Sequence, residues 1–308
     1  MTDDHGNRRA GLLFGLGAYL LWGFLPLYFK LLQGVASTEI VAHRILWSLV
    51  FLVLLVSLWR RWPAIRAALA ASRVMMTLTV TALLIAANWL IYIWAVLNGH
   101  VLAGSLGYYL NPLINVLLGV VILKEKLTRG QIAAVLLAGA GVAVLAAGAA
   151  EGLWISLTLA LTFGLYGFIR KIAPVDALEG LTIETAILAP ISLCWILWLQ
   201  QQGIGGFTAF SATTNALLIL GGALTAIPLL LFNAAAKRLP YSTLGFLQYI
   251  APSLQFLLAV LVFGEAFTPA HMLCFGAIWA ALAIFAFEGL RQSRERARAA
   301  RDCPEPCP

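Results

Sequence analysis

The sequence predicts an all-α, polytopic membrane protein with ten transmembrane helices, arranged as two inverted repeats of five helices. Three observations predict this fold: the composition, the spacing of apolar runs, and an internal repeat whose flanking charges change sides. Of 308 residues, 62% are hydrophobic and 11% are charged, whereas a soluble domain carries roughly 25% charged residues. So few charges cannot cover a water-exposed surface. The composition therefore excludes a soluble enzyme, a nucleic-acid-binding domain and a disordered chain.

The apolar runs account for ten spans. A spanning helix needs about 20 residues, because the hydrocarbon core is about 30 Å thick and a helix rises about 1.5 Å per residue. The first run is too long for a signal peptide and has no convincing cleavage site, so we expect it to remain as an anchor. The predicted spans are 10–31, 38–58, 74–97, 101–123, 131–149, 152–170, 180–200, 215–236, 241–263 and 270–290.

The basic residues predict the orientation of these spans. With the N-terminus inside, 18 of the 20 Lys and Arg residues fall in cytoplasmic segments, and only Lys30 and Arg44 do not. This asymmetry is what the positive-inside rule requires, so both termini are predicted to be cytoplasmic. Because the basic residues are scattered over six short segments, the charge does not indicate a nucleic-acid partner.

Two loops have distinct compositions. The cytoplasmic loop 60–73 predicts a short helix at the membrane surface with Trp62 as its interfacial anchor. The outer loop 201–214 is uncharged and rich in Gly, Ser, Thr and Gln, which is typical of a plain connector.

The chain contains an internal repeat. Positions 109–128 share seven identities with positions 249–268, which divides the chain into halves 1–150 and 151–308. Five spans is an odd number, so the second half must run through the membrane in the opposite sense. The loop at 124–129 is basic, whereas its counterpart at 264–268 has no Lys or Arg. Such inverted repeats build secondary transporters with a site near the bilayer midplane, although a duplicated scaffold is an alternative.

Ionisable residues inside spans are the first candidates for a site, because each is costly to bury in a membrane. Arg44 lies about 9 Å along the second span. Glu39 and His43 share one face of that span. Arg44 and Glu184 hold equivalent repeat positions, which predicts one ion on each side of a central cavity. The alternatives are an internal structural salt bridge, a Glu184 placed near a favourable helix N-terminus, and a Lys30 that reaches the headgroups.

Polar and aromatic residues gather on the third, fourth, eighth and ninth spans, as they would around a cavity for small organic solutes. Taken singly, most of these aromatic residues are equally consistent with packing or lipid contact. Pro112 and Pro252 occupy equivalent positions and predict broken helices there. Glu39 and Glu184 are predicted as sites for a coupling proton. The predicted substrate-binding residues are Lys30, His43, Arg44, Asn88, Trp89, Tyr92, Tyr108, Asn111, Glu184, Gln248 and Tyr249.

The sequence contains no catalytic constellation. Zinc-protease, nucleophile-elbow and Walker A motifs are all missing, so no catalytic residue, no cofactor and no metal are predicted, and a self-contained ATP-driven pump is disfavoured. Cys303 and Cys307 stand in a Pro-rich tail that offers too few ligands for a metal.

Five motifs in the spans are more specific than the repeat. They are Trp22-Gly23-Phe24-x-Pro26, Glu39-Ile40-x-Ala42-His43-Arg44, Asn88-Trp89-x-x-Tyr92-Ile93-Trp94-Ala95-Val96, Ser105-Leu106-Gly107-Tyr108-Tyr109-Leu110-Asn111-Pro112 and Leu244-Gly245-Phe246-x-Gln248-Tyr249-Ile250-x-Pro252.

Together with the ten spans and the inverted repeat, these motifs resemble the EamA group of the drug/metabolite transporter superfamily, and within it the RarD subfamily. The resemblance covers the chain from the first span to the last. It implies a multi-pass permease of the bacterial inner (plasma) membrane that works as an exporter.

The sequence thus predicts a secondary-active transporter that moves a small polar or amphipathic metabolite or drug-like solute by alternating access. Lys30, His43 and Arg44 favour an anionic group on that solute. The expected partners are the small-molecule solute and the lipid bilayer, and no particular oligomeric state is predicted. A non-transporting membrane scaffold or a membrane enzyme is the alternative.

Reporter fusions test the predicted topology. A fusion after residue 130 should report a cytoplasmic location and a fusion after residue 268 an outside location, because the second half is inverted. Activity of a periplasm-specific and a cytoplasm-specific reporter at each site measures this. The same location for both fusions would contradict the inverted repeat.

Overall fold

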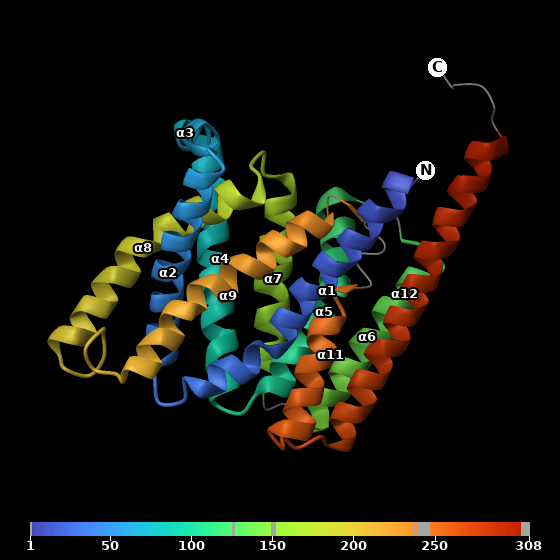
Figure 1. Cartoon of the computed structure of the whole chain (residues 1–308). Coiled ribbons are helices and arrows are strands. Elements are labelled where there is room, and N and C mark those ends of the chain that lie inside the picture. Colours follow the sequence, from blue (N-terminus) through green and yellow to red (C-terminus); the bar gives the residue numbers. More distant parts are fainter. Residues whose placement is uncertain (1, 125–126, 149–151, 237, 240–246, 303–308) are drawn as a thin grey trace. The chain divides into compact units, whose positions relative to one another are not determined.

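The computed structural model describes residues 2–124, 127–148, 152–236, 238–239 and 247–302 (Figure 1). Two residues of the basic loop at 124–129 and the tail with Cys303 and Cys307 lie outside the described residues. Every regular element in the described ranges is a helix, which confirms the predicted all-α class.

Most predicted spans correspond to one helix each. Within the described residues, eight helices are long and apolar enough to cross a membrane, and α5 covers the predicted span 101–123. The ninth span is described only from residue 247, so the count of ten stays a prediction. The elements are α1 (Thr2–Leu31), α2 (Ser37–Leu58), α3 (Trp62–Ala70), α4 (Ser72–Leu97), α5 (Val101–Leu123), α6 (Arg129–Gly148), α7 (Leu153–Ile172), α8 (Ala177–Gln201), α9 (Ala212–Ala236), α11 (Ile250–Leu257), η1 (Leu258–Val262) and α12 (Pro269–Asp302).

The helices pack into two compact units. The first comprises residues 1–111 and 155–265, and the second comprises residues 112–154 and 266–308. Each unit draws on both sequence halves, so packing does not follow the repeat boundary at 150. That boundary remains a prediction from the sequence.

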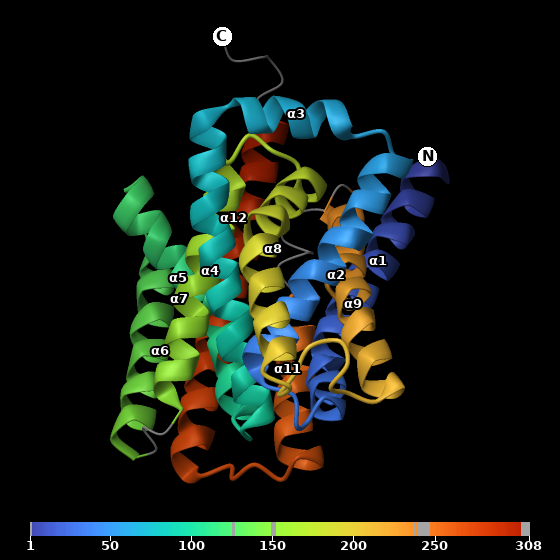
Figure 2. The same ribbon diagram turned by 90° about the vertical axis from the view of Figure 1, so that its left-hand side faces the viewer.

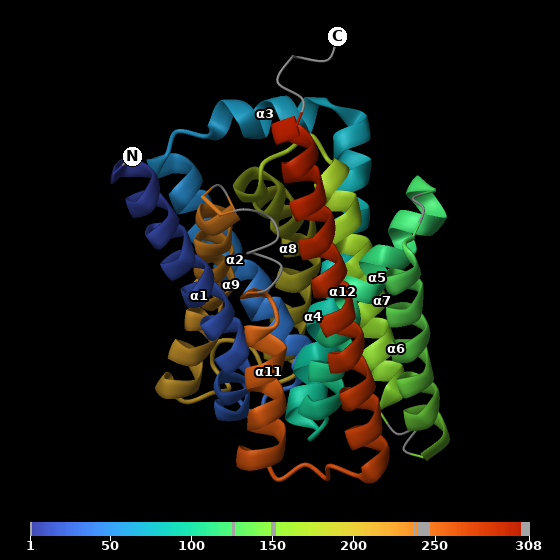
Figure 3. The same cartoon turned by 90° about the vertical axis from the view of Figure 1, so that its right-hand side faces the viewer.

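The first unit is organised around α2 and α8, which lie side by side (Figure 1). These two helices begin at Ser37 and Ala177, which are equivalent positions of the repeat. Helix α9 packs against both α1 and α2, and α11 lies beside α1 (Figure 3). The short helix α3 lies across the ends of α2 and α4 (Figure 2), where a surface helix was predicted. Trp62 at its start is exposed.

The first-turn glutamates of α2 and α8 fasten the two ends of this antiparallel pair. Glu39 of α2 accepts a hydrogen bond from the backbone N–H of Gly206, in the loop that follows α8. Glu179 of α8 accepts one from Arg61, in the loop that follows α2. The two glutamates hold equivalent repeat positions. At each end of the pair, a glutamate of one helix therefore accepts a hydrogen bond from the loop that follows the other helix. Arg61 also pairs with Asp176 at 2.6 Å, and these carboxylates raise the pKa of Arg61, chiefly through the Glu179 hydrogen bond.

In the second unit, α6 and α12 pack side by side (Figure 1). A Cβ added at Gly141 would lie 2.8 Å from Cβ of Ala277 and 3.1 Å from the carbonyl oxygen of Cys274. Small residues at this contact therefore let the two backbones approach closely. Thr128 donates a hydrogen bond to Glu288 at 3.1 Å, which joins the start of α6 to α12.

The two repeat-equivalent prolines differ in their surroundings. Helix α5 continues through residue 112 without a break, contrary to the expectation of matching broken helices. In the second half, Gln248 and Tyr249 form a turn and α11 begins at Ile250. Pro252 is thus in the first turn of α11, where a missing backbone N–H costs no helical hydrogen bond.

A glycine pair tests the close approach of α9 to α2. A Cβ at Gly222 would lie 2.6 Å from the carbonyl oxygen of Trp47, whereas a Cβ at Gly167 would meet no atom within 4 Å. We expect Gly222→Ala to cost about 1–3 kcal/mol, because overpacking forces the backbones apart. Gly167→Ala is the matched control and should leave the melting temperature of the purified protein unchanged. Equal melting temperatures for the two variants would contradict this packing.

Candidate functional site

Arg44 is a buried cation in the middle of the first unit. Helix α2 carries it, and 6% of the residue is exposed. Its Nε donates a hydrogen bond of 2.5 Å to the hydroxyl of Thr225 on α9. Thr225 donates its own hydrogen to the carbonyl of Gly221, which leaves its lone pairs for the arginine. The sequence folds this way because Gly222 lets α9 approach α2 closely.

Aromatic rings surround the Arg44 guanidinium. Its central carbon lies 4.5 Å from the ring centroid of Trp89 and 5.8 Å from that of Phe29. Rings at these distances attract a cation through their negative faces. Tyr28, Tyr92 and Tyr108 also lie close enough to interact electrostatically with the guanidinium. The site therefore consists of one cation among apolar ring faces.

Arg44 has no carboxylate partner in the part of the chain that the structure describes. The ion pairs found there involve His43, Arg61 and Arg170 instead. Buried charges in proteins are normally paired, because an isolated ion is costly to remove from water. An unpaired guanidinium in this position is suited to bind an anion.

The three tyrosines near Arg44 differ in what their hydroxyls do. Tyr28 donates to the carbonyl of Leu217 at 2.8 Å, and Tyr108 donates to Oδ1 of Asn88 at 3.1 Å. The hydroxyl of Tyr92 is buried and has no hydrogen-bond partner among the described residues. Tyr92 therefore keeps a donor that an incoming group can use.

Asn88 is fully engaged within the protein. Its Nδ2 donates to the carbonyl of Leu159 at 3.1 Å and to the hydroxyl of Thr162 at 2.9 Å, and its Oδ1 accepts from Tyr108. These bonds join α4 to α7. Asn88 thus positions Tyr108, and its hydrogen-bonding groups are occupied.

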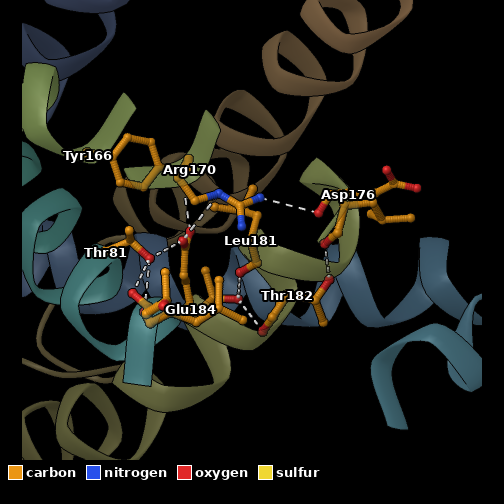
Figure 4. Close-up of polar contacts among 11 residues, drawn as sticks. Thr81, Tyr166, Arg170, Asp176, Leu181, Thr182 and Glu184 are labelled. Atoms are coloured by element: carbon orange, nitrogen blue, oxygen red, sulfur yellow. Dashed lines mark hydrogen bonds and ion pairs between the residues drawn. The ribbon is translucent and has the colours of Figure 1, made fainter. Parts of the chain in front are cut away.

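Glu184, the repeat counterpart of Arg44, has partners on three sides (Figure 4). It is fully buried. It accepts hydrogen bonds from Thr81 at 2.6 Å and from Tyr166 at 3.3 Å, and it lies 3.6 Å from Nε of Arg170. Arg170 also donates to the carbonyl of Asp176 at 3.3 Å. Glu184 thus has an internal cation, whereas Arg44 has no internal anion among the described residues.

Gly180 makes room for the Arg170 side chain. A Cβ at this position of α8 would collide with the Arg170 guanidinium. The glycine lets Arg170, from the last turns of α7, lie flat on α8 and reach Glu184 one turn further along. Arg170 was not among the predicted site residues, because it also looks like an ordinary cytoplasmic flanking residue. The one feature of the sequence that could have identified Arg170 is its repeat position, which is equivalent to that of Lys30.

Arg44 and Glu184 make crossed contacts between the two halves. Arg44 of α2 bonds to Thr225 of α9, and Glu184 of α8 bonds to Thr81 of α4. In each case the helix that carries the charge bonds to the third spanning helix of the other half. Neither threonine was predicted, since nothing distinguishes them in sequence from other threonines in spans.

Lys30, His43 and Glu39 have contacts of their own. Nζ of Lys30 lies 5.1 Å from the ring centroid of Phe263. His43 lies 4.0 Å from Glu39 and 5.0 Å, edge-on, from the ring of Phe207. Among the described residues, no hydrogen bond or ion pair links Lys30 or His43 to Arg44. Glu39 itself is held to the loop after α8.

The remaining predicted residues lie where α5 meets α11. The rings of Tyr109 and its repeat counterpart Tyr249 stack, with their centroids 6.3 Å apart. Gln248 precedes Tyr249 in the turn before α11. Asn111 is buried, and its Oδ1 lacks a partner among the described residues. Among the described residues, no hydrogen bond or ring contact links Asn111, Gln248 or Tyr249 to Arg44.

Known proteins match this chain closely. Residues 9–147 match the EamA-like transporter family. An uncharacterized transporter of Pseudomonas aeruginosa is 47% identical over 94% of this chain and 97% of its own length. Protein RarD of Escherichia coli is 41% identical over 96% of this chain and all of its own length.

A chloramphenicol-sensitive protein RarD of Pseudomonas aeruginosa is 36% identical over 94% of this chain and 97% of its own length. One crystal structure covers 90% of this chain and 97% of its own with a TM-score of 0.57 at 23% identity, and supports the fold alone. The predicted family resemblance is confirmed, as is a multi-pass membrane protein with a transporter role. The chain belongs to the EamA-like transporter family and, within it, to the RarD subfamily.

Proposed function

We propose that the protein is a secondary-active permease that carries a small polar or amphipathic metabolite or drug-like solute across the bacterial inner membrane by alternating access. The observation that carries this proposal is the crossed pair of contacts, Arg44 to Thr225 and Glu184 to Thr81. Inverted repeats give a carrier two equivalent arrangements around a central site. Buried charges at corresponding points of both halves, each bonded to the other half, support such an exchange.

The direction of transport is proposed to be outward, as the RarD resemblance implies, and both termini are proposed to lie in the cytoplasm. A scaffold gains nothing from a buried guanidinium without a carboxylate, because such a charge only lowers stability. A solute that supplies the missing anion offsets this cost during transport.

Glu184 is the better of the two predicted sites for a coupling proton. It is buried within a spanning helix, and it forms an ion pair with Arg170 that depends on its negative charge. Glu39 instead accepts a hydrogen bond from the Gly206 N–H at the proposed outer end of α2. Its carboxylate therefore holds the loop that follows α8. Protonation of Glu184 would free Arg170 and weaken the bond to Thr81.

Flux through the purified protein tests the proposed function. Liposomes that contain the protein and a mixture of cell metabolites should show counterflow of at least one labelled solute. Arg44→Ala should abolish this flux while the protein still folds, since Arg44 makes no ion pair with any described residue. Arg66→Ala, which removes an exposed arginine of α3, is the control. A protein that moves no solute but is recovered with a partner would instead be a scaffold, and turnover of a solute would indicate an enzyme.

The role of Glu184 has a separate test. Glu184→Gln mimics the protonated carboxyl, so solute exchange should continue while accumulation driven by an imposed proton gradient falls to the uncoupled level. Glu184→Ala should lower the melting temperature of the purified protein, because it leaves Arg170 without its carboxylate partner. Gradient-driven accumulation by Glu184→Gln at the wild-type rate would exclude this residue from coupling.

A further inference from the structure

We propose that Arg44 and the hydroxyl of Tyr92 together bind the carboxylate of a monoanionic solute, whose apolar body lies against the rings of Trp89 and Phe29. This inference rests on the proposed transport function and names the class of solute. It follows from the charge, the available donors and the apolar walls around one residue.

The single positive charge of the site favours a solute with one negative charge. Arg44 contributes a single positive charge, and no described carboxylate offsets it. Arg170 of the same unit is already paired with Glu184, which lies 3.6 Å from its Nε. Lys30 lies over Phe263, and His43 faces Glu39 and Phe207. With one cation at the site, a dianion would keep one uncompensated charge, and a cationic solute would be repelled.

The hydrogen-bond donors fit a carboxylate. A guanidinium presents five N–H groups in a planar fork that matches a carboxylate. The described hydrogen bonds occupy only its Nε, with Thr225. The Tyr92 hydroxyl adds a donor that no described residue uses. The hydroxyls of Tyr28 and Tyr108, in contrast, already donate hydrogen bonds to Leu217 and Asn88. Two oxygens of one carboxylate can therefore accept from both Arg44 and Tyr92.

The side chains around Arg44 are mostly aromatic. Trp89 and Phe29 present ring faces to Arg44. Tyr92 packs edge-on against Phe29 at 6.2 Å and against Tyr108 at 5.4 Å. A solute with its carboxylate at Arg44 would place its next atoms among these rings. Such walls favour apolar or aromatic groups over further polar groups.

A set of four probes of similar shape tests this inference on the full-length protein in detergent. The probes are 3-phenylpropionate, its neutral amide 3-phenylpropionamide, the dianion phenylsuccinate and the cation 3-phenylpropylammonium. Thermal stabilisation measures binding, and inhibition of counterflow in liposomes measures access to the carrier. We expect 3-phenylpropionate to bind at least about tenfold more tightly than the other three, since only it satisfies both donors and the charge.

Two substitutions locate the contact. Tyr92→Phe should weaken 3-phenylpropionate binding about tenfold, the loss of one hydrogen bond to a charged group. It should leave the melting temperature of the unliganded protein unchanged, because that hydroxyl has no described partner. Tyr19→Phe, at a buried tyrosine of α1 packed against Trp22 and Phe232, is the matched control and should bind the acid as the wild type does. Arg44→Gln should make the acid and the amide bind equally.

The outcomes separate this inference from the proposed function. If the protein shows counterflow of solutes but binds acid and amide equally, or if Tyr92→Phe binds the acid as the wild type does, the monocarboxylate site is wrong and transport stands. If no solute shows counterflow, transport is wrong. Acid-specific stabilisation that is lost in Arg44→Gln would then still support the site.

Discussion

The desolvation of charge inside the spanning helices is the constraint on which the rest of the first unit depends. A buried ion must find hydrogen bonds and an opposite charge, or it lowers the stability of the fold. Glu184 meets this condition with Thr81, Tyr166 and Arg170. Arg44 meets it only in part, with Thr225 and two ring faces. The helix pairs α2–α9 and α4–α8 are joined at these points, so the packing and the candidate site share one cause.

The α2–α8 pair has equivalent residues at its two opposite ends. Glu39 and Glu179 occupy the same turn of equivalent helices, yet one holds a backbone N–H of a glycine loop and the other an arginine. The acceptor is a glutamate at both ends, while the donor is a backbone N–H at one end and an arginine at the other. A basic donor is suited to the side predicted to be cytoplasmic, and an uncharged one to the outer side. The two glutamates therefore occupy equivalent positions but bind donors of different charge.

Much of this could be predicted because charges are so scarce in the sequence. Arg44 stands out as a basic residue that the topology does not explain, and the repeat leads from it to Glu184. Arg170 could not be found in this way, because a basic residue at the end of a span normally marks the cytoplasmic face. The loop 201–214 looked like a plain connector, since the backbone N–H that Glu39 uses leaves no trace in residue type. Thr81 and Thr225 were missed for a similar reason, as only the packing of α4 and α9 distinguishes them.

The crossed threonine contacts have a consequence for motion between helices. A direct Arg44–Glu184 ion pair would satisfy both charges, but leaving one partner of a buried pair without the other costs about 3–5 kcal/mol. A hydrogen bond between a charged group and a hydroxyl is worth about 1.5–3 kcal/mol. Hydrogen bonds of this kind join α2 to α9 and α8 to α4. In the proposed transport cycle, binding of a solute or a proton can offset the free energy lost when such a bond breaks. By pairing each charge with a threonine of the other half, the fold keeps the helices joined while leaving Arg44 unneutralised. The proposed alternation between two packings requires both properties, because an arginine paired with Glu184 could neither move readily nor bind a solute.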